Sequence, residues 1–214
     1  MSTQPADSLI PDERFATAAT KEAVHRAAEA ARERGLNVEI VHTVSEARKL
    51  VDGLLPTDKT IFTASSETLR LSGITEDIDE SGRFVSLRAQ LREAGAERDF
   101  EQLRVRSTTP DVVVGSVHAV TELGQLVVAS ASGSQLSPYA AGAGKVVWVV
   151  GAQKVVPDLE TALLRIRTYS YPKENKRCLE VYGQPSFLSK ILIIEREVFP
   201  DRCTLVLVGE AIGF

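Results

Sequence analysis

Three short runs of uninterrupted apolar residues constrain the fold of this chain more than any other feature of its sequence. The runs are Val112–Val114, Leu126–Ala129 and Val146–Val150, and β-branched residues dominate them. A strand with one face in water alternates apolar and polar residues, whereas a strand buried on both faces is apolar throughout. The runs therefore predict strands inside a sheet that is covered on both sides by helices.

Helices are expected to alternate with these strands. The first starts at Pro11, where Asp12 and Glu13 favour a helix N-terminus, runs through an Ala-rich segment to Arg34 and ends at Gly35. Further helices are predicted over 45–55 with Ser45 as N-cap, over most of 66–108, over a short turn at 117–123 and over 158–167. Further strands are predicted over 38–41, 60–64, 190–194 and 204–208, and the last two either pair as a hairpin or enter the sheet separately.

This alternation predicts an α/β layered domain. Residues 11–214 are interpreted as a single domain, because no low-complexity linker or internal repeat divides them, and residues 1–10 as a flexible N-terminal tail. Open α/β sheets bind ligands at the carboxyl ends of their strands. The candidate chemistry is therefore sought in the loops that follow Ala64, Gly115, Ala129, Val150 and Val208.

The charge balance argues against a nucleic-acid or membrane partner. The chain has 25 basic and 29 acidic residues and a formal charge of −4, so it has no global attraction for polyanions. Its longest uncharged stretch, from Leu123 to Gly144, is too polar to span a bilayer. Residues 1–7 lack the basic and apolar segments of a signal peptide, and two cysteines without a CxxC pattern indicate a reducing cytoplasm.

The first candidate site lies after the predicted strand 60–64. Ser65, Ser66 and Thr68 would present hydroxyl and backbone N–H groups to an anion at a helix start. The alternative is that Ser65 or Ser66 only caps the helix.

The second candidate is the pair His118 and Glu122. Residues four apart share a face of a helical turn, where an imidazole and a carboxylate can act as general acid and base. The alternative is that His118 hydrogen-bonds a loop and Glu122 balances a helix end.

A third candidate is the serine-rich loop that follows Leu126–Ala129. Its small polar residues would let a ligand approach the backbone closely; they are Ser130, Ser132, Gly133, Ser134 and Gln135. A surface loop without function is the alternative. No metal site or cofactor is expected, because the three histidines are far apart in sequence and neither cysteine has a close ligand neighbour.

Several segments, taken in their order along the chain, resemble the LUD domain family of lactate-utilisation proteins. They are Gly115–Ser130, which includes Thr121-Glu-Leu-Gly124, Lys145–Glu160, Arg165–Arg167, Leu207–Phe214 and Ser66-Glu-Thr68 with Gly73-Ile74. The resemblance implies the fold of sugar-phosphate isomerases and coenzyme A transferases (the NagB/RpiA/CoA-transferase-like superfamily). That fold is a twisted, mostly parallel sheet flanked by helices.

The resemblance also bears on cofactors and on Glu122. Some coenzyme A transferases of this fold use a glutamate followed by Asn-Gly as nucleophile, but Leu123 stands here where they have asparagine. Related family members carry a cysteine-rich segment, whereas the corresponding region here has only Cys178. An iron–sulfur cluster needs about four cysteine ligands, so we expect no cluster on this chain.

The primary hypothesis is a cytoplasmic protein of lactate or related 2-hydroxy-acid utilisation. It would bind a small anionic metabolite at the strand ends, with Glu210 after the last strand as a further carboxylate, and would work with iron–sulfur partner proteins. Two alternatives are a non-catalytic accessory subunit of an iron–sulfur lactate oxidase complex and an enzyme resembling coenzyme A transferases or sugar-phosphate isomerases. The sequence leaves open whether the chain is an enzyme and whether it forms a homo-oligomer.

Overall fold

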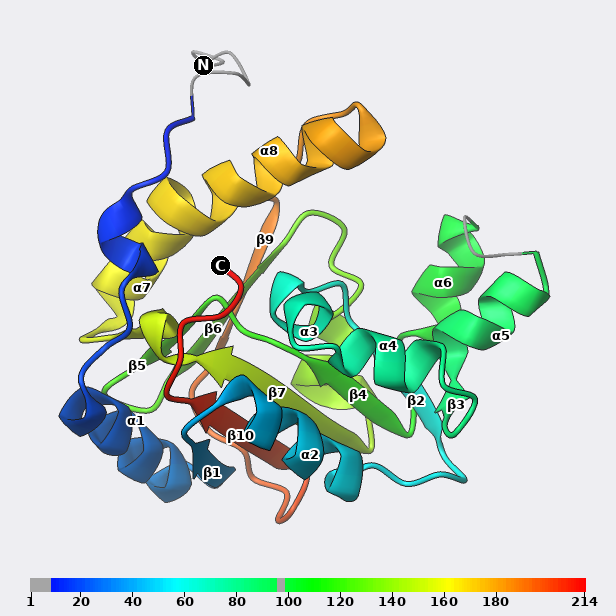
Figure 1. The fold of residues 1–214 in the computed structure, drawn as a ribbon, viewed down its shortest axis with the longest axis horizontal. Helices are drawn as coiled ribbons and strands as arrows, with labels where there is room; N and C mark the ends of the chain where they lie inside the picture. Colours follow the sequence, from blue (N-terminus) through cyan, green and yellow to red (C-terminus); the bar gives the residue numbers. More distant parts are fainter. Residues whose placement is uncertain (1–8, 96–98) are drawn as a thin grey trace.

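The computed structural model describes residues 9–95 and 99–214, and at its centre is a six-stranded sheet whose neighbouring strands are all parallel (Figure 1). The strand order is β1-β10-β7-β4-β2-β3. The bounds are β1 Asn37–Val41, β2 Thr60–Thr63, β3 Val85–Ser86, β4 Val112–Gly115, β7 Lys145–Gly151 and β10 Cys203–Val208. With helices on its faces, this sheet confirms the predicted α/β class.

A second, four-stranded sheet packs beside the first. It contains β8 Val155–Val156, β5 Ala119–Thr121, β6 Leu126–Ser130 and β9 Lys190–Ile194, in that order. The strand β6 runs antiparallel to both of its neighbours. The loop after Ala129 therefore leaves a different sheet from the loops after Ala64, Gly115, Val150 and Val208.

Burial on both faces explains the apolar runs. On one face of the large sheet, Val112, Val114 and Val147 pack against helices α2, α3 and α4. On the other face, Val113 and Val146 join a cluster that includes α1, α5 and the inner side of the small sheet. The outer side of the small sheet packs against α7. Helices thus cover one face of β4 and β7, and helices together with the second sheet cover the other face.

The helices occupy the expected segments with shifted ends. The α-helices are α1 Lys21–Glu33, α2 Val44–Leu54, α3 Glu67–Leu71, α4 Ile74–Asp79, α5 Leu87–Glu93, α6 Phe100–Arg106, α7 Leu159–Arg165 and α8 Tyr171–Tyr182. Single turns of 3-10 helix span Glu13–Ala16 and Ala152–Lys154, and π-helical turns span Pro138–Gly142 and Ile166–Ser170. The predicted helix 158–167 thus continues through a π-turn into α8, and the largely helical middle of the chain contains the short strand β3.

Two predicted helix starts are wrong. The helix expected from Pro11 to Arg34 is broken, because Ala19 N–H donates to Ala152 O at 3.2 Å and Thr20 caps a new start at Lys21. Thr43, not Ser45, caps α2, because Glu46 stands at its third position and completes a reciprocal capping box with Thr43.

The helical turn predicted at 117–123 is wrong: the segment contains the strand β5, Ala119–Thr121, followed by a turn at Glu122 and Leu123. His118 N–H donates to Val127 O at 2.9 Å and Glu122 N–H donates to Val156 O at 2.8 Å, so this segment bonds to its neighbours rather than to itself. Of the two arrangements left open for the last strands, separate entry is the correct one, since β9 lies in the small sheet and β10 in the large one.

The predicted N-terminal tail lies outside the described residues, except for Leu9 and Ile10, which have no regular structure. No helix in the described part of the chain combines the length and the apolar character that crossing a membrane requires.

Gly115 at the end of β4 is a sensitive test of the packing above the sheet. A Cβ added there would lie 1.6 Å from the hydroxyl oxygen of Tyr139, which is buried and packs edge-on against Trp148. Gly115→Ala is expected to lower the free energy of unfolding by about 1–3 kcal/mol through overpacking. Urea unfolding measures it, and Tyr139→Phe in the same chain should recover part of the loss.

Gly53→Ala is the matched control. Gly53 lies in α2, where an added Cβ would have no atom within 4 Å. This substitution should raise the free energy of unfolding by about 0.5–1 kcal/mol through helix propensity. Equal effects of the two substitutions would contradict the packing described.

Candidate functional site

The carboxyl ends of four parallel strands meet at one edge of the large sheet. Thr68 follows β2 in α3, Ser116 follows β4, Lys154 follows β7, and Ile212 follows β10. The hydroxyl groups of Thr68 and Ser116 converge on the amine nitrogen of Lys154, and the backbone carbonyl of Ile212 accepts from Thr68. This is the edge where open α/β sheets place their ligands.

Lys154 is buried without a carboxylate. Its Nζ donates to Thr68 Oγ1 at 2.9 Å and to Ser116 Oγ at 3.1 Å, and the residue is 2% exposed. Burial, and after it the charge of Arg165, holds the pKa of Lys154 well below the usual value for lysine. The site thus contains an amine in an environment that disfavours its protonated form.

Arg165, at the end of α7, is a second buried basic side chain. Its Nη1 donates to His118 O at 2.5 Å and to Ser170 Oγ at 2.8 Å, and its Nε donates to Gln153 O at 3.3 Å. Its Nη2 is buried and has no hydrogen-bond partner among the described residues. Burial lowers the pKa of Arg165 to about 10, which leaves the guanidinium charged at neutral pH.

His118 is held as a neutral imidazole. Its Nδ1 accepts a hydrogen bond from Ala129 N–H at 3.1 Å, which places the ring proton on Nε2. Burial, followed by the charges of Lys154 and Arg165, lowers the pKa of His118 to about 3. His118 is therefore a hydrogen-bond donor through Nε2 and not a proton acceptor at neutral pH.

Lys154, Arg165, His118, Thr68 and Ser116 form one polar cluster, and its electrostatics favour the binding of an anion. In residues 9–95 and 99–214, no carboxylate lies within ion-pair distance of Lys154 or Arg165. A buried charge without a partner costs several kcal/mol. An anion that reached these two side chains would offset that cost.

The segment after β10 covers the cluster. Gln153 holds it, since its Nε2 donates to Ile212 O at 2.8 Å and to Gly213 O at 3.0 Å while its Oε1 accepts from Ile212 N–H. Gly213 lies directly on Thr68, where an added Cβ would be 2.3 Å from Oγ1. Lys154 is therefore enclosed by backbone as well as by side chains.

Of the three predicted anion donors Ser65, Ser66 and Thr68, only Thr68 contacts Lys154. Ser66 is the N-cap of α3 and accepts from Leu69 N–H at 3.4 Å, and Ser65 accepts from Arg88 Nη2 at 3.0 Å. The capping alternative thus describes Ser66. Exposure falls along this segment from Ser65 through Ser66 to buried Thr68, so the segment leads from solvent to Lys154.

The structure does not bring His118 and Glu122 together. They flank opposite ends of β5, because the segment is extended rather than helical. Glu122 forms an ion pair with Arg26 of α1 at 2.6 Å. Glu210 accepts from Val44 N–H at 2.7 Å and so satisfies the first backbone N–H group of α2. Both carboxylates thus have partners away from Lys154.

The serine-rich loop is bonded to itself. Ser130 Oγ donates to Gln135 Oε1 at 3.0 Å and accepts from Gly133 N–H at 2.9 Å. Ser132 Oγ donates to Ser134 Oγ at 3.2 Å. These bonds fix the shape of the loop and need no ligand.

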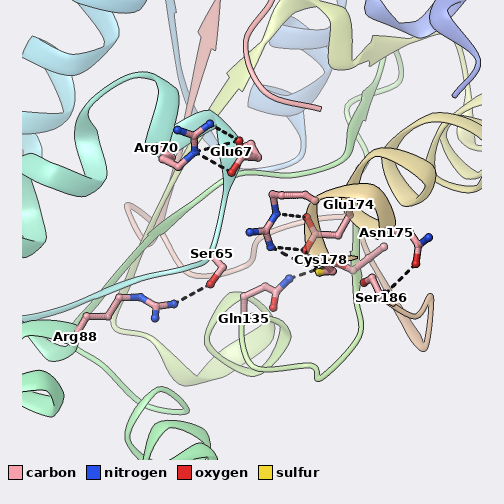
Figure 2. A network of polar contacts seen from close by, with 11 residues as sticks. Ser65, Glu67, Arg70, Arg88, Gln135, Glu174, Asn175, Cys178 and Ser186 are labelled. Carbon is pink, nitrogen blue, oxygen red and sulfur yellow. Dashed lines mark hydrogen bonds and ion pairs between the residues drawn. The ribbon is translucent and has the colours of Figure 1, made fainter. Parts of the chain in front are cut away.

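Polar side chains of this loop, of α3 and of α8 lie in one region of the molecule (Figure 2). In that view Gln135 points toward Cys178 of α8, and Ser65 lies in the same region. The ion pair Glu67–Arg70 belongs to α3 and the ion pair Glu174–Arg177 to α8. Arg70 first, and Arg177 after it, lower the pKa of Glu67, so the charges of the two helices interact.

A shallow surface hollow of about 480 Å³ lies at the opposite edge of the sheet, where β1 and β10 begin. Its lining residues are Arg32, Leu36, Asn37, Val38, Glu39, Leu54 and Thr204. No group of three or more His, Cys, Asp or Glu side chains in the described residues could hold a metal ion.

Lys154, Arg165 and Ser116 were missed as site residues by sequence reasoning. A signal for Lys154 was available, because it is the one charged residue between Val146 and Val156. A charge that interrupts an otherwise apolar segment is seldom buried without a reason. Arg165 gave no such signal, since basic residues are common in the last turn of a helix.

Comparison with known proteins places the chain in a family. The sequence profile described as LUD domain matches residues 24–208. A solved structure of a DUF162 family protein from Deinococcus radiodurans is similar with a TM-score of 0.49 and 10% sequence identity, over 87% of this chain and 96% of that chain. No curated protein matched.

The neutral imidazole of His118 predicts a specific response of stability to pH. Between pH 6.5 and about 3 the unfolded chain binds a proton at His118 that the folded chain does not. Acidification through this window therefore removes about 1.4 kcal/mol of stability per pH unit from this one residue. The variant His118→Gln, measured by urea unfolding across the same window, should show a slope shallower by that amount. Parallel curves for the two proteins would contradict a neutral buried His118.

Proposed function

The chain belongs to the LUD domain family, and we propose that it binds a small organic anion, a 2-hydroxy acid such as lactate or the matching 2-oxo acid, at Lys154 and Arg165. The observation that carries the proposal is the presence of two buried basic side chains, Lys154 and Arg165, with no carboxylate partner in the described residues. The name of the family links it to lactate utilisation, which supports this choice of ligand.

The polar groups of the cluster suit such a ligand. A carboxylate accepts charge-assisted hydrogen bonds, the strong type, from Arg165, whose buried Nη2 has no partner in the described residues. The oxygen on the neighbouring carbon would interact with Ser116 or with the Nε2 proton of His118. Hydroxyls and a neutral imidazole suit a lactate hydroxyl or a pyruvate carbonyl, since neither oxygen carries a full charge.

We further propose that the redox centres needed for lactate oxidation lie on partner proteins. The chain has two cysteines, on α8 and at the start of β10, whereas an iron–sulfur cluster needs about four cysteine ligands. After anaerobic incubation with iron and sulfide, we expect desalted protein to retain no stoichiometric iron. A bound cluster would overturn this assignment.

The binding proposal is tested by calorimetry on Lys154→Met. Titration of the wild type with L-lactate and pyruvate should show binding, and the neutral analogue 1,2-propanediol should bind at least about tenfold more weakly, a difference of about 1.4 kcal/mol. Lys154→Met should lose carboxylate binding by a similar factor or more. The substitution removes a buried amine that folding must desolvate. The free energy of unfolding of the Lys154→Met protein should therefore equal or exceed that of the wild type.

Lys145→Met is the control, since Lys145 is exposed at the start of β7. It should bind as the wild type does. Failure of every carboxylate to bind the folded wild type would contradict the proposal. So would loss of stability in Lys154→Met with unchanged binding, because that result would make Lys154 a structural residue.

A further inference from the structure

We propose that Lys154 is a nucleophile that condenses with the carbonyl group of a 2-oxo acid to form an imine. The proposal deepens the anion site and rests on it, since it names the 2-oxo acid as the reactive member of the ligand pair. Its basis is the hydrogen-bond arrangement around Nζ together with the position of Arg165.

The hydroxyl groups around Nζ are oriented as acceptors. Thr68 Oγ1 donates its own hydrogen to Ile212 O at 3.3 Å, and Ser116 Oγ donates to Val117 O at 3.3 Å. Each oxygen is then left to accept from Lys154, at 2.9 and 3.1 Å respectively. Nζ therefore has two acceptors.

Two acceptors match a neutral amine and not an ammonium group. An ammonium group has three hydrogens, and no third acceptor for Nζ is found among the residues that the structure describes. A neutral amine uses both hydrogens on Thr68 and Ser116 and keeps its lone pair unengaged. A lone pair in that condition is the requirement for attack on a carbonyl carbon.

The surroundings keep the amine in that form. Lys154 is 2% exposed, and desolvation beside another cation is an established way to activate a lysine amine. Burial and the charge of Arg165 both lower the pKa of Lys154. The same Arg165 is available to the substrate, since its Nη2 has no partner in the described part of the chain.

The position of Arg165 selects a 2-oxo acid over a simple aldehyde. In a 2-oxo acid the carboxylate is attached directly to the carbonyl carbon. A carboxylate held by Nη2 of Arg165 would therefore present the adjacent carbon to the neighbouring amine. Reaction partners held in this way gain a large effective concentration.

The reaction balances without an oxidant or a reductant. The lone pair of Nζ attacks the carbonyl carbon, a C–N bond forms, and the carbonyl oxygen becomes a hydroxyl group. That hydroxyl then leaves as water as the C=N bond forms. The two hydrogens that Nζ loses become the two hydrogens of the water, and the hydroxyls of Thr68 and Ser116, already bonded to Nζ, are placed to relay them.

The test is reductive trapping with pyruvate and sodium borohydride, read by intact mass and peptide mapping. The hydride converts an imine into a stable secondary amine. We expect one adduct per chain, located on Lys154. Its yield should reach half of its maximum at the pyruvate concentration that half-saturates binding in calorimetry. L-lactate has no carbonyl group, so it should form no adduct but should protect against pyruvate.

Two variants complete the design. Lys154→Arg keeps a long basic side chain but cannot form the imine under these conditions, so its adduct should fall by at least about tenfold. Lys145→Arg, at an exposed position, should trap as the wild type does. If Lys154→Arg does not fold, the mapped position of the wild-type adduct still decides the question.

The outcomes separate this inference from the anion site. Pyruvate binding without an adduct on Lys154 would overturn the nucleophile and leave the proposed function intact. An adduct spread over exposed lysines, unaffected by lactate, would also overturn it. Absence of both binding and adduct would overturn the two proposals together.

Discussion

The pairing of β10 with both β1 and β7 is the interaction on which the rest of the structure depends. The strand β10 is the last along the chain, yet it lies inside the large sheet and pairs in parallel with a neighbour on each side. Its residues Leu205, Val206 and Leu207 have no exposed surface. This insertion brings the segment after β10 to the carboxyl edge, where Gln153 fixes Ile212 and Gly213 over Lys154.

The cluster around Lys154 is a local exception to the physics that stabilises the sheet. Apolar burial on both faces stabilises β4 and β7 at roughly 25 cal/mol per Å², while the same burial disfavours the charges of Lys154 and Arg165. A chain selected for stability alone would have an apolar side chain at position 154. Polar groups that oppose the fold around them are typical of sites that bind or react.

Most of the polar residues that first suggested a site serve the fold. Ser66 caps α3, Glu210 satisfies the first backbone N–H group of α2, Glu122 pairs with Arg26, and the serine-rich loop bonds to itself. Residue type alone could not distinguish these structural roles from ligand contacts. Hydroxyls and carboxylates at loop ends bond to the unpaired backbone N–H groups of a helix terminus as readily as to a ligand. The interpretation of His118 and Glu122 as a pair was wrong for another reason: it assumed a helical turn, whereas β5 is extended and pairs with β6 in a hairpin and with β8 farther along the chain.

The sequence by itself determined the class of fold and predicted the edge of the sheet at which the candidate site lies. The runs at Val112, Leu126 and Val146 require burial on both faces, and parallel strands necessarily end on one side, so the loops after Ala64 and Gly115 were correctly expected near each other. Only the tertiary structure decided which side chains meet at that edge. The contacts of Lys154 come from positions 68 and 116, and its neighbours Arg165 and Ile212 come from α7 and the segment after β10. Local pattern carries no information about such distant neighbours, because the free energy of a buried amine depends on what surrounds it in space and not on the residues beside it in sequence.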